Sequence, residues 1–226
     1  MATTSDVTVV TGSGDEAPAA EATDRPLRAD ARRNRLKVLD AAEALFSERG
    51  LRVQIEDIAR RAGVGVGTVC RHFVTKDDLL DAVLTRSYVQ LRDAAVAALD
   101  DPDGATAFES FVLATSDFQS EHKALAEQMK EGLDLSPAAV AVRIELFEAM
   151  SQLVRRAQKA GTVRPDIGPA DIGILFGGIA QAAASRVELD ATMRQRYVRI
   201  LLDGLRPANP SKLPGRPLEF SDVSEP

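Results

Sequence analysis

The spacing of apolar residues along the chain follows the period of an α-helix rather than that of a strand. Over residues 31–48, Leu39, Ala42 and Phe46 form one stripe, and Gly50 follows as a helix terminator. No stretch of useful length alternates between apolar and polar residues, which is the pattern of a half-buried strand. The hydrophobic pattern therefore predicts an all-α fold.

Two short helical patterns follow the first. Residues 54–61 and 66–73 carry apolar residues at helical spacing, and the segment Gly63–Gly65 between them is too short for anything but a tight turn. Two short helices joined by such a turn are typical of a helix-turn-helix, whose second helix enters the major groove of DNA. We expect Val69 and Phe73 to point into the core and the rest of the second helix to point outward.

Helix-start signals mark the remainder of the chain. Thr75 and Asp78 form a predicted cap at the start of a long helix, and Ser136-Pro137 and Gly168-Pro169 mark two later starts. About nine helices are expected in all, the later ones covering residues 106–120, 122–131, 137–160, 169–186 and 190–204.

The two ends of the chain lack this pattern. Residues 1–26 are rich in Ala, Thr and acidic residues with no apolar period, and residues 207–226 contain five prolines. Both ends are expected to be disordered. Between them we expect a three-helix, helix-turn-helix domain over residues 27–74 and a larger helical domain over residues 75–206.

Composition excludes several classes of protein. The 226 residues include one cysteine, Cys70, and two histidines, so we expect no disulfide framework and no metal site. No nucleophile–base pair, carboxylate pair or phosphate-binding loop stands out, so we expect no enzyme and no cofactor. The N-terminus lacks a secretory signal, and the longest nearly apolar run, residues 172–184, is too short to cross a membrane. A cytoplasmic protein with no membrane partner is expected.

Positive charge is concentrated near the N-terminus. Residues 28–76 contain eleven Lys and Arg and six Asp and Glu, a net charge of +5, whereas the whole chain carries −6. A basic module on an acidic body is expected when one part of a protein contacts a polyanion. Charge alone leaves open the alternative of a solvated basic surface.

A series of short motifs between residues 31 and 84 matches one known family in order and spacing. The motifs are Leu39-Asp40-Ala41-Ala42, Leu45-Phe46, Gly50, Asp57-Ile58-Ala59, Ala62-Gly63-Val64, Gly67-Thr68, His72-Phe73 and Lys76-Asp77-Asp78-Leu79-Leu80. In these residues the chain resembles the TetR family of transcriptional repressors. The resemblance implies a DNA-binding N-terminal domain and a C-terminal domain for ligand binding and dimerisation.

The resemblance also implies which residues contact DNA. Carried over position by position, they are Gln54, Val66, Gly67, Thr68, Cys70, Arg71, His72 and Lys76. Three arginines are placed to reach an adjacent groove: Arg32, Arg33 and Arg35. The chain departs from the family at Cys70, where tyrosine is usual, and at Gly65 and Val53, where Ser and Thr often cap helices.

Structural interpretations of several of these residues stay open. Thr68 fits a helix start, His72 fits a helix cap, and Cys70 fits either an inert small side chain or a redox-active thiol. His122 stands alone near a helix start, where a structural role competes with ligand binding.

The last long helices suggest a dimer. A stripe of large apolar residues flanked by Gly and Ala is typical of one half of a two-fold four-helix bundle, the alternative being a helix buried within one chain. The expected interface residues are Ile172, Leu175, Phe176, Ile179, Met193, Tyr197, Ile200 and Leu201.

Aromatic and methionine residues recur on the middle helices. At helical spacing such residues are more often plain core, but the family resemblance implies a small-molecule cavity between these helices. The candidate cavity residues are Phe108, Phe111, Phe118, Met129, Phe147 and Met150, with Arg143 and Gln181 as polar groups.

Together these features predict a homodimeric transcriptional repressor that a small molecule of unknown identity releases from a double-stranded DNA operator. A constitutive, architectural DNA-binding protein is the alternative, because it would share the helix-turn-helix but need no cavity. A small helical enzyme would need a reactive cluster that the sequence does not contain.

Overall fold

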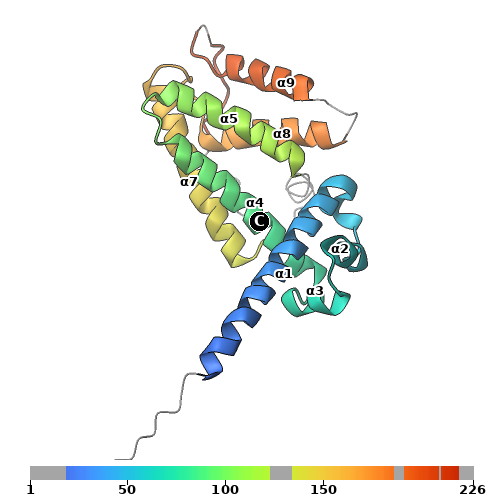
Figure 1. Ribbon diagram of the computed structural model, residues 1–226. Coiled ribbons are helices and arrows are strands. Elements are labelled where there is room, and N and C mark those ends of the chain that lie inside the picture. The colour runs from blue at the N-terminus through green and yellow to red at the C-terminus, as the bar shows by residue number, and fades with distance from the viewer. Residues whose placement is uncertain (1–18, 123–133, 186–190, 209, 219–226) are drawn as a thin grey trace, which may run out of the picture.

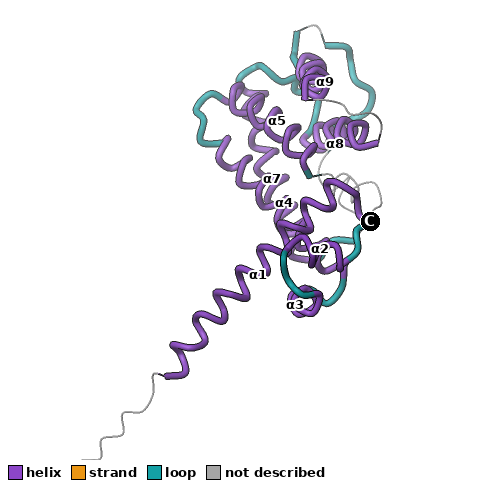
Figure 2. Tube along the Cα trace, turned by 45° about the vertical axis from the view of Figure 1, so that its right-hand side comes forward, coloured by secondary structure: helices purple, strands orange, loops and turns teal. Residues whose placement is uncertain are grey.

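A computed structural model describes residues 19–122, 134–185, 191–208 and 210–218, and all regular structure within them is helical (Figure 1). The helices form a small N-terminal head and a larger body, and α4 (Lys76–Ala98) runs from one to the other (Figures 1 and 2). None of the helices in the described ranges is both long and apolar enough to span a bilayer. The all-α prediction is confirmed.

The head consists of α1 (Ala19–Arg49), the short 3₁₀ helix η1 (Gly50–Arg52), α2 (Ile55–Ala62) and α3 (Val66–His72). Helices as short as α2 and α3 are marginal by themselves in water, so their stability comes from packing. Their apolar faces close on the stripe of α1, and the buried residues of this core include Val38, Leu39, Ala42, Leu45, Phe46, Val53, Ile58, Val69 and Phe73.

The first helix is longer than the sequence pattern predicts. α1 begins at Ala19 rather than near Ala31, so residues 19–26 of the expected disordered arm are helical and Pro26 lies inside the helix. The boundary expected at residue 26 is therefore wrong. Figure 2 shows the start of α1 extending away from both the head and the body, where no apolar stripe is needed to cover a neighbour.

The start of α4 confirms the predicted cap. The Asp78 N–H donates to the Thr75 hydroxyl at 3.0 Å, and the Thr75 N–H donates to the Asp78 carboxylate at 2.9 Å. Leu79 and Leu80 are buried in the core behind this cap. Further along, α4 packs against α7 (Pro137–Lys159), so one continuous helix joins the head to the body.

The rest of the body is built from α5 (Gly104–Glu121), α8 (Pro169–Ser185) and α9 (Ala191–Gly204) around α4 and α7. As predicted, Ser136 caps α7 with Pro137 in the first helical turn. The helix expected over residues 122–131 lies outside the described residues apart from His122, which ends α5. The expected cap Asp190 also lies outside them.

The proline-rich C-terminal segment is non-helical, as predicted, but it is fixed to the body. The Arg164 guanidinium donates to the Ser211 carbonyl at 2.6 Å, and the Leu218 N–H donates to the Asp171 carboxylate at 3.2 Å. Gly168 lies so close to Leu218 that a Cβ there would overlap the Leu218 carbonyl oxygen. The expectation of disorder is therefore wrong for residues 210–218, because side-chain-to-backbone bonds hold a segment that has no apolar period.

Candidate nucleic-acid interface and internal cavity

A left-handed glycine forms the turn between α2 and α3. Gly63 has φ = 68°, and its N–H donates to the Arg60 carbonyl at 3.3 Å, which ends α2. A side chain in this conformation would strain the backbone, so glycine is required here. Gly65, with φ = −71°, then starts α3, and α3 packs directly against α2. The predicted helix-turn-helix is confirmed.

The two faces of α3 differ as predicted. Val69 is fully buried and Phe73, which follows the helix, is 5% exposed, so both hold α3 against the head. The remaining side chains lie on the outer surface, exposed or half-exposed, and these are Val66, Thr68, Cys70, Arg71 and His72, with Gly67 among them. This outer surface, residues 66–68 and 70–72, is called the α3 face below.

The arginines near the α3 face differ in their partners. Arg60 pairs with Asp57 within α2, and Arg61 donates to the Glu48 carboxylate at 2.8 Å. The Arg61 guanidinium holds the pKa of the Glu48 carboxyl below its ordinary value. Arg71 is exposed and forms no ion pair within the described parts of the chain. The positive charge of the α3 face is therefore not neutralised by the carboxylates around it.

Two of the residues carried over as DNA contacts have partners in the head. The Lys76 ammonium donates to the Leu51 carbonyl, which ties the start of α4 to η1. The Gln54 side chain donates to the Arg52 carbonyl at 3.1 Å while Gln54 itself is the N-cap of α2. Val53 is buried in the core, which accounts for an apolar residue where the family often has threonine.

The basic segment of α1 reaches the end of the α3 face. The Arg35 guanidinium lies 5.1 Å from the centre of the Phe73 ring, a cation–π distance. Arg33 pairs with Asp30 one turn earlier, and Arg32 is exposed. Arg35 therefore lies beside the C-terminal end of α3.

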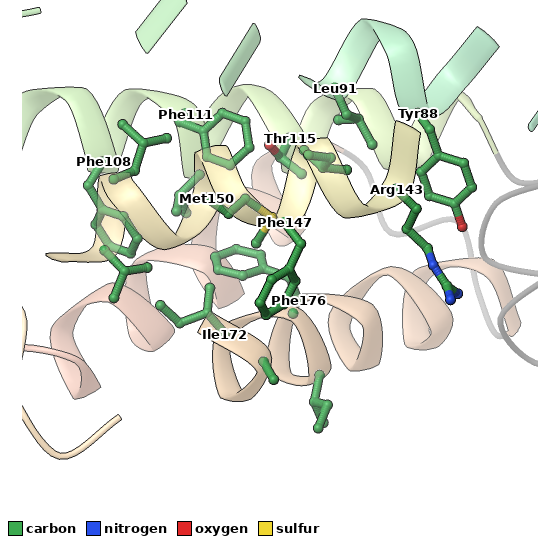
Figure 3. A pocket seen from close by; sticks show the side chains of 17 residues that line it. Tyr88, Leu91, Phe108, Phe111, Thr115, Arg143, Phe147, Met150, Ile172 and Phe176 are labelled. Atoms are coloured by element: carbon green, nitrogen blue, oxygen red, sulfur yellow. The ribbon is translucent and has the colours of Figure 1, made fainter. Parts of the chain in front are cut away.

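A cavity of about 240 Å³ lies in the body between α4, α5, α7 and α8 (Figure 3). Five of the eight predicted cavity residues line it: Phe108, Phe111, Arg143, Phe147 and Met150. Phe118 does not line it and stacks on His122 instead, so that prediction is wrong. Met129 and the side chain of Gln181 lie outside the described residues.

The sequence analysis missed most of the cavity's other walls. The main ones are Tyr88 and Leu91 from α4, Thr115 from α5, and Ile172 and Phe176 from α8. Figure 3 shows the Tyr88 and Arg143 side chains next to each other at one end of the cavity. Burial raises the pKa of the Tyr88 phenol above its ordinary value of 10.0, and the nearby Arg143 guanidinium acts in the opposite direction.

The apolar face of α8 and α9 is only partly the one predicted. Ile172 and Phe176 are buried at the cavity, so their assignment to a dimer interface is corrected. The exposed large apolar residues are Ile174 and Leu175 on α8 with Met193, Tyr197 and Ile200 on α9. Ile179 and Leu201 are half-buried. The surface of Ile174, Leu175, Met193, Tyr197 and Ile200 is called the α8–α9 face below.

A helix-turn-helix head on an all-helical body with an internal cavity defines a DNA-binding transcriptional regulator. Residues 38–83 match the description "Bacterial regulatory proteins, tetR family", and residues 103–207 match "Transcriptional regulator SbtR-like, C-terminal domain". The chain belongs to the TetR family of transcriptional regulators. Its relatives are regulators rather than enzymes.

The similarity to individual relatives extends over nearly the whole length of each relative. A TetR regulatory protein from Mycobacterium vanbaalenii is 36% identical with a TM-score of 0.59, over 80% of this chain and 99% of that one. The transcriptional repressor KstR2 from Rhodococcus jostii is 29% identical over 76% of this chain and 90% of its own length. The regulator UidR from Escherichia coli K12 is 25% identical over 81% of this chain and 98% of its own length.

Proposed function

We propose that this regulator is a repressor that binds double-stranded operator DNA as a homodimer and is released by a small molecule bound in the cavity. The observation that carries the proposal is the position of α4. It lines the cavity with Tyr88 and Leu91, and it begins at Lys76, which is bonded to the head beside α3. A ligand that favours one position of α4 therefore favours one position of the α3 face.

The proposed DNA contacts are the α3 face together with Gln54 and Lys76. The exposed methyl groups of Val66 suit the methyl group of thymine, and Thr68 suits a base edge or a phosphate. Arg71 supplies an unneutralised cation for a phosphate. An ammonium carries three donors, so Lys76 can keep its bond to Leu51 and also reach a phosphate at the start of α4.

A dimer would let two heads read two half-sites. One helix-turn-helix contacts few base pairs, and dimers bind half-sites about one helical turn apart. The α8–α9 face is the proposed interface, because α8 and α9 pack on each other and each carries exposed large apolar residues. The distance between the two α3 faces would then depend on how each head sits on its body.

The test starts from DNA selected out of a random pool by the purified protein. Affinity for the selected duplex and for a scrambled duplex is measured by fluorescence anisotropy between about 50 and 300 mM salt. We expect at least about 10³-fold preference for the selected duplex. Equal affinity for both duplexes at every salt concentration would overturn the proposal.

A pair of matched variants tests the α3 face. Arg71→Ala should weaken operator binding and lower the salt dependence by about one counterion, because it removes a phosphate contact. Arg155→Ala removes an exposed arginine on α7 and should leave both quantities unaltered. If compounds that stabilise the protein thermally never lower its operator affinity, the protein is a ligand-independent DNA binder instead.

A further inference from the structure

The side chains that line the cavity are chemically sorted along its length. Figure 3 shows Phe108 and Ile172 toward one end, Tyr88 and Arg143 together at the other, and Thr115 between them. The remaining walls are apolar or aromatic apart from the thioether of a methionine. The cavity therefore has one polar end and one apolar end.

The polar end is rich in hydrogen-bond donors and carries a positive charge. The Arg143 guanidinium has only donors, and the Tyr88 phenol, whose pKa burial raises above its ordinary value, carries a proton that it can donate. The Thr115 hydroxyl is enclosed and has no hydrogen-bond partner within the described part of the chain. No Asp or Glu is among the described residues that line the cavity. An arginine set among mostly apolar walls forms a charge-assisted hydrogen bond with an anion, which is stronger than a bond between neutral groups.

The volume of the cavity matches a small occupant. A cavity of about 150 Å³ in an apolar protein core holds benzene, whereas this one measures about 240 Å³. In proportion, it holds roughly ten non-hydrogen atoms. With a carboxylate at one end, that leaves an apolar part of roughly seven carbons, as in octanoate.

We propose that the cavity takes a small apolar monocarboxylate, with its carboxylate on Arg143 and Tyr88 and its hydrocarbon part between Phe108 and Ile172. The inference rests on the proposed function, since it identifies the chemical class of the effector. An anion of this kind pairs with Arg143 and removes apolar surface from water along the rest of its length.

The test compares three ligands with the same eight-carbon chain. Octanoate, 1-octanol and octylamine are titrated into the full-length protein by calorimetry, with a thermal shift measured in parallel. Octanoate should bind about tenfold or more tightly than 1-octanol, because a charge-assisted bond to Arg143 is added, and octylamine should bind most weakly. Equal binding of octanoate and 1-octanol, or tighter binding of octylamine, overturns the proposal.

Variants of Arg143 test whether this residue is the source of the preference for octanoate over 1-octanol. Arg143→Gln should lower octanoate affinity about tenfold or more and 1-octanol affinity much less. Arg143→Lys, which keeps the charge, should restore part of the loss and covers the case in which the glutamine variant fails to fold. Arg155→Gln, an exposed arginine on the same helix, is the control. An Arg143→Gln protein that binds octanoate as the wild type does, or an Arg143→Lys protein that binds octanoate no better than 1-octanol, contradicts the assignment.

Operator release separates this proposal from the proposed function. If octanoate binds through Arg143 but leaves operator affinity unaltered, the ligand class stands and release by this ligand fails. If octanoate does not bind while a neutral or cationic compound releases the operator, the ligand class is overturned and the proposed function stands.

Discussion

The imidazole of His122 lies against the carboxylate of Glu43, with 2.6 Å between Nδ1 and Oε1. His122 lies at the end of α5, which lines the cavity with other residues, and Glu43 lies on α1 in the head. Phe118 stacks on His122 with 3.8 Å between ring centres, and Arg86 of α4 lies 3.8 Å from the other oxygen of Glu43. Helices α1, α4 and α5 therefore converge at this pair, which joins the cavity to the head by a route other than the backbone of α4.

Breaking the His122–Glu43 pair should weaken the coupling between effector and operator. We expect Glu43→Gln and His122→Ala each to reduce the coupling free energy between effector and operator by about 0.5–2 kcal/mol, because a contact between the head and the body is lost. The measurement is operator affinity with and without saturating effector. In a double-mutant cycle the two losses should add only in part, since the His122–Glu43 contact is lost in both variants and the Arg86–Glu43 pair is lost only in Glu43→Gln.

Glu109→Gln serves as the control for that prediction. Glu109 also lies on α5 and pairs with an arginine, but its partner Arg199 lies on α9 within the body. The coupling should therefore be unaltered in this variant. A coupling loss as large as that in Glu43→Gln would mean that any ion pair of α5 matters, and the specific role of His122 would be wrong.

Two glycines of the helix-turn-helix should respond in opposite directions to the same substitution. Gly63→Ala places a Cβ on a residue with φ = 68° and should lower the free energy of unfolding by about 1–2 kcal/mol. Gly67 lies inside α3 with open space around it, so Gly67→Ala should stabilise the protein by about 0.5–1 kcal/mol. Urea unfolding of both variants tests this, and a stabilised Gly63→Ala protein would contradict the turn geometry.

The C-terminal segment should detach when Gly168 gains a side chain. A Cβ at Gly168 overlaps the backbone of Leu218, so Gly168→Ala should lower stability by about 1–3 kcal/mol. It should also speed tryptic cleavage after Lys212, an exposed residue of that segment. Gly204→Ala, with no atom near the new Cβ, is the control. Unaltered cleavage in Gly168→Ala would show that the segment is not fixed at Leu218.

Local chemistry in the sequence predicted the helix ends that depend on it. Thr75 and Asp78 satisfy each other's backbone groups across one turn, and Gly63 meets a conformational need that few other residues meet. Such signals involve residues a few positions apart, so they can be recognised without knowing the rest of the fold. The start of α1 carries no signal of this kind, and its position was predicted wrongly.

The cavity and the exposed faces depend instead on how helices meet. α8 is apolar around much of its circumference, so its period does not distinguish the buried Ile172 and Phe176 from the exposed Ile174 and Leu175. Tyr88 has the spacing of a core residue of α4, and only the approach of α7 places Arg143 beside it. Phe118 likewise has the spacing of a cavity residue, yet it covers His122. These positions are decided by tertiary packing.

The Tyr88 phenol should make stability fall at alkaline pH. Its pKa is raised by burial in the folded protein, so above pH 10.0 the unfolded chain loses this proton first and unfolding is favoured. The stabilising effect is therefore complete below pH 10.0 and is lost as the pH rises through the pKa of the folded state. Tyr88→Phe should flatten this alkaline decline.

Urea unfolding of wild type and Tyr88→Phe between about pH 8 and pH 11 measures the difference. The chain contains one other tyrosine, Tyr197, and no tryptophan, so the absorbance change on phenol ionisation can be assigned to Tyr88 by subtracting the variant. At neutral pH the variant should lose about 0.5–1.5 kcal/mol, because the hydrogen bond between Tyr88 and Arg143 is removed. Parallel alkaline declines in the two proteins would mean that Tyr88 does not ionise late, and the donor proposed for the effector carboxylate would be lost at a lower pH.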